Sequence, residues 1–169
     1  MLGPEAVALM NREENLDLSV APTLFIEFHG ITTGQLSEVL EMAEEICRAE
    51  GCLEFRPGLG RAERDRIFKA RHGLGETIIR NHPGCRVLST DVAVPNTQYP
   101  ELIKTIHDEV NAYKIVGYTL SHAGDGNVHL VVAGKKGDQK EWDKIDRVIN
   151  TVVTLSLIHI SRAHETALR

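Results

Sequence analysis

The amino-acid sequence predicts an α+β fold, in which an antiparallel or mixed sheet is covered by helices on one face. Stretches with apolar residues at every third or fourth position, typical of amphipathic helices, separate short strand-like runs rich in apolar and β-branched residues. The last two strand-like runs are joined only by a short loop containing glycine, which favours an antiparallel hairpin. The predicted order is strand, helix, strand, helix, strand, helix, strand, strand, helix.

The first half of the chain is predicted to alternate strands with helices. The elements are a strand at 23–28, a helix at 33–50, a short strand at 52–55 and a helix at 61–79. Gly51 is a natural end for the first helix. Gly73 and Gly75 weaken the middle of the second helix, because glycine costs about 1 kcal/mol relative to alanine inside a helix.

The second half is predicted to contain three strands and two helices. They are a strand at 85–95, a helix at 98–113, strands at 114–121 and 127–133, and a helix at 138–153. The last helix carries Trp142, Ile145 and Val148 on one apolar stripe. We expect this stripe to be helix core and not a cofactor site.

Composition limits the class of protein but not its chemistry. The chain has 169 residues, 42% hydrophobic and 25% charged, which is typical of a soluble globular domain. Its net charge of -5 argues against a nucleic-acid partner. No run reaches the ~20 apolar residues of a membrane span, and no signal peptide is recognisable. Cys47, Cys52 and Cys85 stand at no metal-like spacing and are expected to be reduced thiols of a cytoplasmic protein.

The segment Ser121–His129, with the sequence SHAGDGNVH, is the densest in functional side chains. If its flanking strands are antiparallel, the turn brings His122 and His129 close enough for both imidazoles to bind one divalent cation. A carboxylate as third ligand would leave an open position for substrate. On spacing alone, a glycine-rich hairpin with two incidental histidines explains the pattern equally well. A phosphate-binding turn is disfavoured, because the loop joins two strands and does not open a helix.

Ser121–His129 resembles the G-H-x-G-D-G-N-x-H run of the FAD-linked oxidases related to D-lactate dehydrogenase, glycolate oxidase and D-2-hydroxyglutarate dehydrogenase, with serine in place of the first glycine. Other segments resemble the same family in the same order: FKARH at 68–72, PGC at 83–85, STDVAVP at 89–95 and YPE at 99–101. They are most similar to the D-lactate dehydrogenase branch, and the resemblance extends from about residue 23 to residue 153.

The resemblance implies a fold, a reaction and site residues. The C-terminal part of such proteins is a ferredoxin-like cap over FAD, which an N-terminal domain binds. The C2 hydrogen of a 2-hydroxy acid passes to FAD as hydride, a base takes the hydroxyl proton, and a divalent metal, zinc or manganese, holds the substrate. By position, His122 and His129 would be metal ligands and Arg71 would bind the substrate carboxylate. Without the resemblance, Arg71 beside Lys69 would be interpreted as a solvated surface charge.

The sequence departs from this family in two places, so we expect a partial copy. The FAD-binding domain is expected to be absent, with residues 1–153 forming part of the cap. The family's Glu-His-Gly-x-Gly run, with the third metal ligand and the expected base, has no counterpart in the tail, which reads TLSLIHISRAHETALR. Residues 154–169 are therefore expected to be a foreign segment. No catalytic residue is assigned within the chain, and the chain alone is expected to be inactive.

Partners and alternatives follow from the same resemblance. The electron acceptor would be a cytochrome, a quinone or an electron-transfer flavoprotein, and the full-length protein would be cytoplasmic or peripheral to the inner membrane. Which 2-hydroxy acid is the substrate stays open. The alternative function is a stand-alone ferredoxin-like module that binds a small acid or a metal without catalysis. A metal-dependent hydrolase is disfavoured, because the valine-rich strands carry no acidic cluster.

Overall fold

The computed structural model describes residues 1–58 and 60–156. The chain divides into two compact units. The sheet unit consists of Met1–Thr23 and the residues from Gly73 onward, and the middle unit is Leu24–His72. In the part of the chain that the structure describes, no helix is long and apolar enough to cross a membrane.

The sheet unit is built on an antiparallel sheet whose central strand is β4. Its strands are β1 (Cys85–Ser89), β2 (Val92–Ala93), β3 (Val116–His122) and β4 (Asn127–Lys135). One edge of β4 pairs with β3, and the other edge pairs with β1 and then β2. The predicted α+β class with an antiparallel sheet is confirmed.

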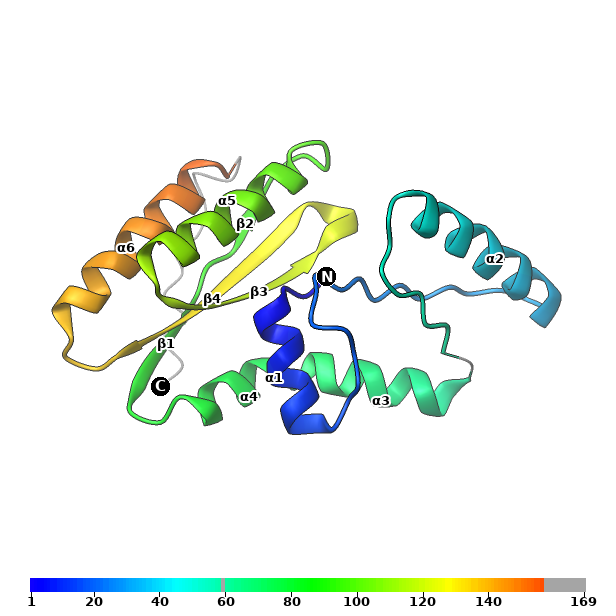
Figure 1. Cartoon of the computed structure of the whole chain (residues 1–169), viewed down its shortest axis with the longest axis horizontal. Coiled ribbons are helices and arrows are strands. Elements are labelled where there is room, and N and C mark those ends of the chain that lie inside the picture. Colours follow the sequence, from blue (N-terminus) through cyan, green and yellow to red (C-terminus); the bar gives the residue numbers. More distant parts are fainter. Residues whose placement is uncertain (59, 157–169) are drawn as a thin grey trace. The chain divides into compact units, whose positions relative to one another are not determined.

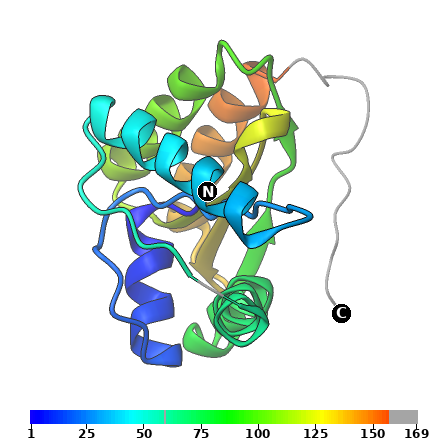
Figure 2. The same cartoon turned by 90° about the vertical axis from the view of Figure 1, so that its right-hand side faces the viewer.

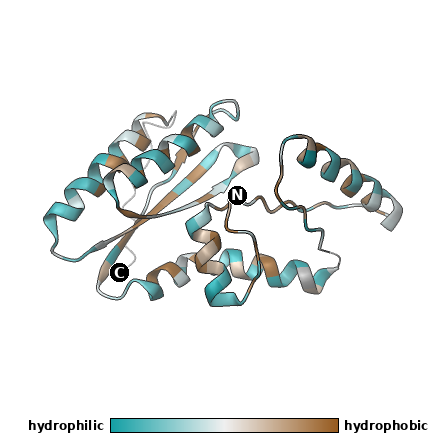
Figure 3. Cartoon of the chain, viewed as in Figure 1, coloured by the Kyte–Doolittle hydropathy of each residue, from teal (hydrophilic) through white to brown (hydrophobic). Residues whose placement is uncertain are grey.

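Helices α5 (Tyr99–Tyr113) and α6 (Gln139–Thr154) lie side by side and cover one face of this sheet (Figure 1 and Figure 2). Alternate residues of a strand point to the same face, so one set of β4 side chains meets the two helices. The core contains Val128, Leu130, Val132, Leu102, Ile106, Ile145 and Val148. Figure 3 shows hydrophobic residues along the central strand and hydrophilic residues on the outer turns of both helices.

The order of these elements agrees with the ferredoxin-like expectation. The chain runs strand, helix, strand, strand, helix, and β4 lies between the two strands that α5 connects. This arrangement is a split βαβ unit followed by a further helix. It places the β3–β4 hairpin, with its two histidines, at one end of the sheet.

Two more helices pack on the opposite face, in addition to the predicted layer. They are α1 (Pro4–Glu14), which contacts β3, and α4 (Leu74–Asn81), which contacts both α1 and β1. Helix α1 has no counterpart among the predicted elements. Val7 and Met10 of α1 are buried, together with Ile78 of α4.

The middle unit contains α2 (Thr33–Ala49) and α3 (Arg61–His72) but none of the predicted strands. The helix predicted at 33–50 is confirmed, with the Thr32 hydroxyl accepting a hydrogen bond from the Gln35 amide at its start. The strands predicted at 23–28 and 52–55 are wrong. In the described chain neither segment pairs as a strand, apart from a single bridge between Thr23 and Leu2, and a strand needs a neighbouring strand for its backbone groups.

Two predicted elements are each divided in the structure. The helix predicted at 61–79 is broken at Gly73 into α3 and α4, near the weak point that the glycines indicated. The strand predicted at 85–95 is divided into β1 and β2 at Thr90 and Asp91. The helices predicted at 98–113 and 138–153 and the hairpin between them are confirmed within two residues.

The predicted foreign segment, 154–169, falls largely outside the described residues, which end at 156. Helix α6 ends at Thr154, and the Ser156 hydroxyl bonds to the backbone N–H and carbonyl of Ala93 at 3.2 Å each. The boundary at residue 153 stays a prediction.

Candidate functional site

The loop between β3 and β4 is a tight turn that requires glycine at position 126. It consists of a 3₁₀ turn at Ala123–Asp125 and Gly126, whose φ is +67°. A Cβ on residue 126 would lie 2.0 Å from the carbonyl oxygen of Val94. Only glycine therefore fits, and the turn fixes how the two strand ends meet.

The structure brings His122 and His129 together, as the antiparallel hairpin predicts. His122 ends β3 opposite Asn127, and His129 stands opposite Leu120. In this register both imidazoles lie on the same face of the sheet, opposite to the face that α5 and α6 cover. Their ring centroids are 6.3 Å apart, and the planes are nearly perpendicular at 85°. Two imidazoles at this separation are near enough to approach one small ligand or ion from two sides.

His129 is held by groups from the neighbouring strand. Its Nδ1 lies 3.2 Å from the backbone carbonyl oxygen of Thr90 and 3.7 Å from Oδ1 of Asp91. The Asn127 side-chain amide donates a 2.7 Å hydrogen bond to the same Asp91 oxygen. These contacts engage Nδ1 and leave Nε2 as the nitrogen that can bind a ligand. His129 is half-buried, with 33% of its side chain exposed.

A second contact anchors the strand just before His122. The buried Ser121 hydroxyl lies 2.5 Å from the phenol oxygen of Tyr99, at the start of α5. Burial raises the pKa of Tyr99, and the hydrogen bond with Ser121 opposes this effect. Ser121 stands at the position of the first glycine in the G-H-x-G-D-G-N-x-H run. The hydrogen bond between α5 and β3 therefore uses a hydroxyl that glycine would not supply.

Arg71 lies in the last turn of α3, within the middle unit, and is half-buried. The two histidines lie in the sheet unit. The expected role of Arg71 at the substrate carboxylate therefore stays a prediction.

Sequence reasoning missed the groups around His129. From the sequence alone, no role is assigned to Thr90, Asp91 or Asn127. The signal that could have found them is the strand register, because Ser89 pairs with Val131 and Val92 with Val128. The same register places Asp91 directly opposite His129.

Among the described residues, no group of three or more His, Cys, Asp and Glu side chains is arranged to hold a metal ion. The two histidines can supply two ligands, and the Asp91 carboxylate is turned toward Asn127 and the Nδ1 side of His129. A complete coordination sphere would need a donor from elsewhere, such as a substrate.

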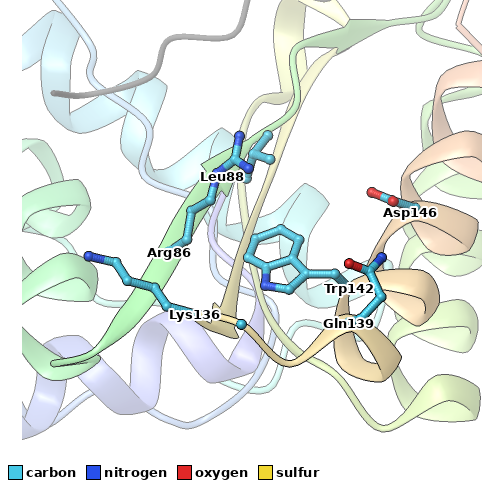
Figure 4. A pocket seen from close by; sticks show the side chains of 7 residues that line it. Arg86, Leu88, Lys136, Gln139, Trp142 and Asp146 are labelled. Atoms are coloured by element: carbon cyan, nitrogen blue, oxygen red, sulfur yellow. The ribbon is translucent and has the colours of Figure 1, made fainter.

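A hollow in the sheet unit lies away from the histidines. Figure 4 shows it between β1 and α6, with a volume of about 500 Å³. It is lined by Arg86, Leu88, Lys136, Gly137, Gln139, Trp142 and Asp146. The Arg86 guanidinium lies 5.3 Å from the Trp142 ring centroid, and Trp142 also packs against the core, as expected of a helix-core residue. The hollow lies on the face that α5 and α6 cover, whereas both histidines lie on the opposite face. It is therefore not part of the candidate site, which we place at the histidines.

The chain has relatives among flavin-linked oxidoreductases. It is 36% identical over 138 residues to the zebrafish (Danio rerio) protein named "Probable D-lactate dehydrogenase, mitochondrial", covering 82% of this chain and 27% of that protein. It is 28% identical over 129 residues to the "D-lactate dehydrogenase [cytochrome], mitochondrial" of Kluyveromyces lactis, covering 74% and 22%. It is 24% identical over 108 residues to "Glycolate oxidase subunit GlcD" of Bacillus subtilis, covering 64% and 23%.

The chain thus spans about a quarter of the length of these relatives. The family described as "FAD linked oxidases, C-terminal domain" matches residues 2–159, nearly the whole chain. The match includes both units and the hairpin with its two histidines. The chain therefore belongs to the C-terminal domain family of the FAD-linked oxidases.

Proposed function

We propose that this chain forms the substrate-side part of a flavin-dependent D-2-hydroxy acid dehydrogenase, with D-lactate or glycolate as the substrate. The observation that carries the proposal is the pair of imidazoles, His122 and His129, whose centroids lie 6.3 Å apart at the end of the sheet. In the proposed reaction the C2 hydrogen leaves as hydride to FAD and the hydroxyl proton goes to a base, which gives a 2-oxo acid.

His122 and His129 would hold a divalent cation, zinc or manganese. Imidazole nitrogens suit zinc, and two protein nitrogens leave positions for a further ligand and for the substrate's oxygens. When bound, the cation would polarise the substrate hydroxyl and lower its pKa. His122 is exposed and His129 half-exposed, so a ligand can reach both rings.

Arg71 would bind the carboxylate of the hydroxy acid. A guanidinium can donate two parallel hydrogen bonds to one carboxylate, which fixes the acid's orientation as well as its charge. No residue of this chain is assigned as the base. That role is proposed for the histidine of the Glu-His-Gly-x-Gly run of the family.

The electron acceptor of the reduced flavin would be a cytochrome, a quinone or an electron-transfer flavoprotein. A cytochrome is named in the Kluyveromyces lactis relative. An acceptor in a membrane would place the full-length protein at the surface of that membrane.

The metal part of the proposal is tested by titrating the purified chain with Co²⁺ and recording its visible absorption. We expect one site per chain, lost in both His122→Ala and His129→Ala and retained in His107→Ala, which removes an exposed imidazole from α5. D-lactate should tighten Co²⁺ binding, because its hydroxyl and carboxylate oxygens would complete the coordination. Equal Co²⁺ binding by the wild type and both site variants would refute the metal role.

The second candidate function is a ferredoxin-like module that binds a small acid or a metal without catalysis. The observation in its favour is that the described residues contribute only two histidines to the candidate centre. An FAD-binding reading frame directly upstream in the genome would support the dehydrogenase, and its absence would favour the binding module.

A further inference from the structure

We propose that Thr90 and Asp91, at the break between β1 and β2, position His129: they hold its Nδ1 as a hydrogen-bond donor and leave Nε2 as the nitrogen that binds metal. The inference rests on the proposed metal role of the histidine pair and assigns residues that the family comparison leaves without a role.

The break is not caused by an extra residue. Ser89 pairs with Val131 and Val92 with Val128, so the register is the same on both sides of it. Thr90 therefore stands opposite Leu130, and Asp91 opposite His129. The ladder of backbone hydrogen bonds is interrupted because a side-chain hydroxyl takes the place of a backbone carbonyl as acceptor.

Thr90 uses its side chain where a regular strand would use its backbone. Its N–H donates to the Leu130 carbonyl at 2.9 Å, as in a regular antiparallel pair. The return bond, from the Leu130 N–H, goes to the Thr90 hydroxyl at 3.0 Å and not to the Thr90 carbonyl. The Thr90 carbonyl is thus released from the ladder. It lies 3.2 Å from His129 Nδ1, and the Ser89 hydroxyl donates to it as well at 3.2 Å.

A carbonyl oxygen can only accept, so this contact requires the hydrogen of the neutral imidazole to be on Nδ1. The Asp91 carboxylate, 3.7 Å from Nδ1, favours the same N–H by its charge. Asn127 holds that carboxylate in place through its 2.7 Å hydrogen bond. A metal-binding histidine that donates its other N–H to a carbonyl or carboxylate is the usual second layer of a metal site, and loss of such a partner costs about 10–100-fold in metal affinity.

The alternative interpretation is that Thr90 has a purely structural role, in which its buried hydroxyl only accepts the hydrogen bond from the Leu130 N–H. That interpretation predicts a loss of stability on substitution but no defined tautomer at His129. The tautomer is therefore the measurement that separates positioning from structural support.

The test uses the full chain labelled with ¹⁵N-histidine, at a pH about two units above the ordinary histidine pKa of ~6.5. Long-range ¹H–¹⁵N spectra report which ring nitrogen carries the hydrogen. We expect the Nδ1–H form for His129 in the wild type and in Thr90→Ser, which keeps the hydroxyl. We expect a shift toward the Nε2–H form in Asp91→Ala and in Thr90→Val, with folding of each variant checked by its amide spectrum.

Metal affinity is the second readout, with Co²⁺ as the probe. Asp91→Ala should weaken Co²⁺ binding by about 10–100-fold. The matched control is Asp125→Asn, which removes one negative charge from the same hairpin. Among the described residues, no hydrogen bond or ion pair joins Asp125 to either histidine. A control effect as large as that of Asp91→Ala would show that the position of the Asp91 carboxylate beside Nδ1 does not matter, and would overturn the proposal.

The outcomes separate this inference from the proposed function. If the wild type binds no Co²⁺ but His129 is in the Nδ1–H form and loses it in Asp91→Ala, the positioning stands and the metal role fails. If His129 is in the Nε2–H form in the wild type, or its tautomer is the same in all variants, the positioning is overturned even where metal binds.

Discussion

The backbone carbonyl of Val94 lies directly beside Gly126, so close that a Cβ on residue 126 would stand 2.0 Å from its oxygen. Gly126 also has a φ of +67°, which L-residues rarely adopt. We expect Gly126→Ala to destabilise the chain by at least about 2 kcal/mol, from the left-handed backbone and the clash together. Chemical denaturation measures this cost.

The matched control is Gly124→Ala in the same loop, where an added Cβ meets no atom within 4 Å. We expect it to change the free energy of unfolding by less than about 0.5 kcal/mol. Equal costs for the two variants would contradict the geometry of the hairpin that carries the histidines.

The core of the sheet unit lies between the sheet and helices α5 and α6, whereas α2 of the middle unit has an exposed apolar face. Ile145 is 0% exposed, whereas Ile46 of α2 is 59% exposed. Ile145→Ala should cost about 2–5 kcal/mol, because it removes buried methyl groups and leaves a cavity. Ile46→Ala, the same substitution on an exposed helix face, should stay within about 0.5 kcal/mol. Denaturant midpoints of the two variants check this, and a large cost for Ile46→Ala would show that α2 buries this face in solution.

Thr90 contributes both to the stability of the sheet, through its hydroxyl, and to the contacts of His129, through its carbonyl. In Thr90→Val the buried Leu130 N–H loses its acceptor, which should cost about 1–3 kcal/mol. Thr90→Ser keeps the hydroxyl and should cost clearly less. Urea unfolding compares the two, and a cost of Thr90→Val no larger than that of Thr90→Ser would contradict the contribution of this hydrogen bond.

Alkaline pH should weaken the fold through two tyrosines. Burial raises the pKa of Tyr99 and of Tyr118 above the ordinary value of about 10. The folded chain therefore holds these protons more tightly than the unfolded chain. The resulting stability is fully present below about pH 10 and is lost as the pH rises through the folded-state pKa values.

We expect the free energy of unfolding to fall as the pH rises above about 10, and to fall less in the Tyr99→Phe/Tyr118→Phe variant. Each phenol also makes a hydrogen bond, Tyr99 to Ser121 and Tyr118 to His82, so the variant will be less stable at the lower pH. The comparison is therefore between the two pH slopes. Identical slopes would contradict the raised pKa values.

The chain alone is expected not to oxidise D-lactate, even with added FAD. Hydride transfer needs a flavin held beside the substrate and a base for the hydroxyl proton, and no residue of this chain is assigned to either task. The check is dye-linked D-lactate oxidation by the purified chain. Turnover above the buffer control would contradict the assignment of the base and the flavin site to other segments.

The sequence predicted the strands of the sheet unit and the helices α5 and α6 that cover one face of the sheet, but not α1. Glycines between two strand-like apolar runs located the hairpin, and apolar spacing located α5 and α6. These elements were predictable because their local pattern agrees with their partners in the fold. The proximity of the His122 and His129 side chains followed from the antiparallel hairpin alone.

The remaining features depend on contacts that a local pattern does not contain. The segment 23–28 has the composition of a strand, but only Thr23 makes a strand-like bridge in the described chain. Helix α1 is stabilised by burial of its apolar residues against β3 and α4, which periodicity over eleven residues indicates only weakly. The role of Thr90 arises from its hydroxyl replacing a backbone acceptor, which only the register reveals.

The measurement that tests the account most directly is anomalous X-ray diffraction from crystals of the chain grown with Zn²⁺ and D-lactate, recorded at the zinc absorption edge. The account predicts a zinc peak about 2.0–2.1 Å from Nε2 of both His122 and His129, with the lactate oxygens on its open side. A zinc peak bound elsewhere, with none between these two rings, would contradict the assignment of the histidine pair as the substrate-binding metal centre.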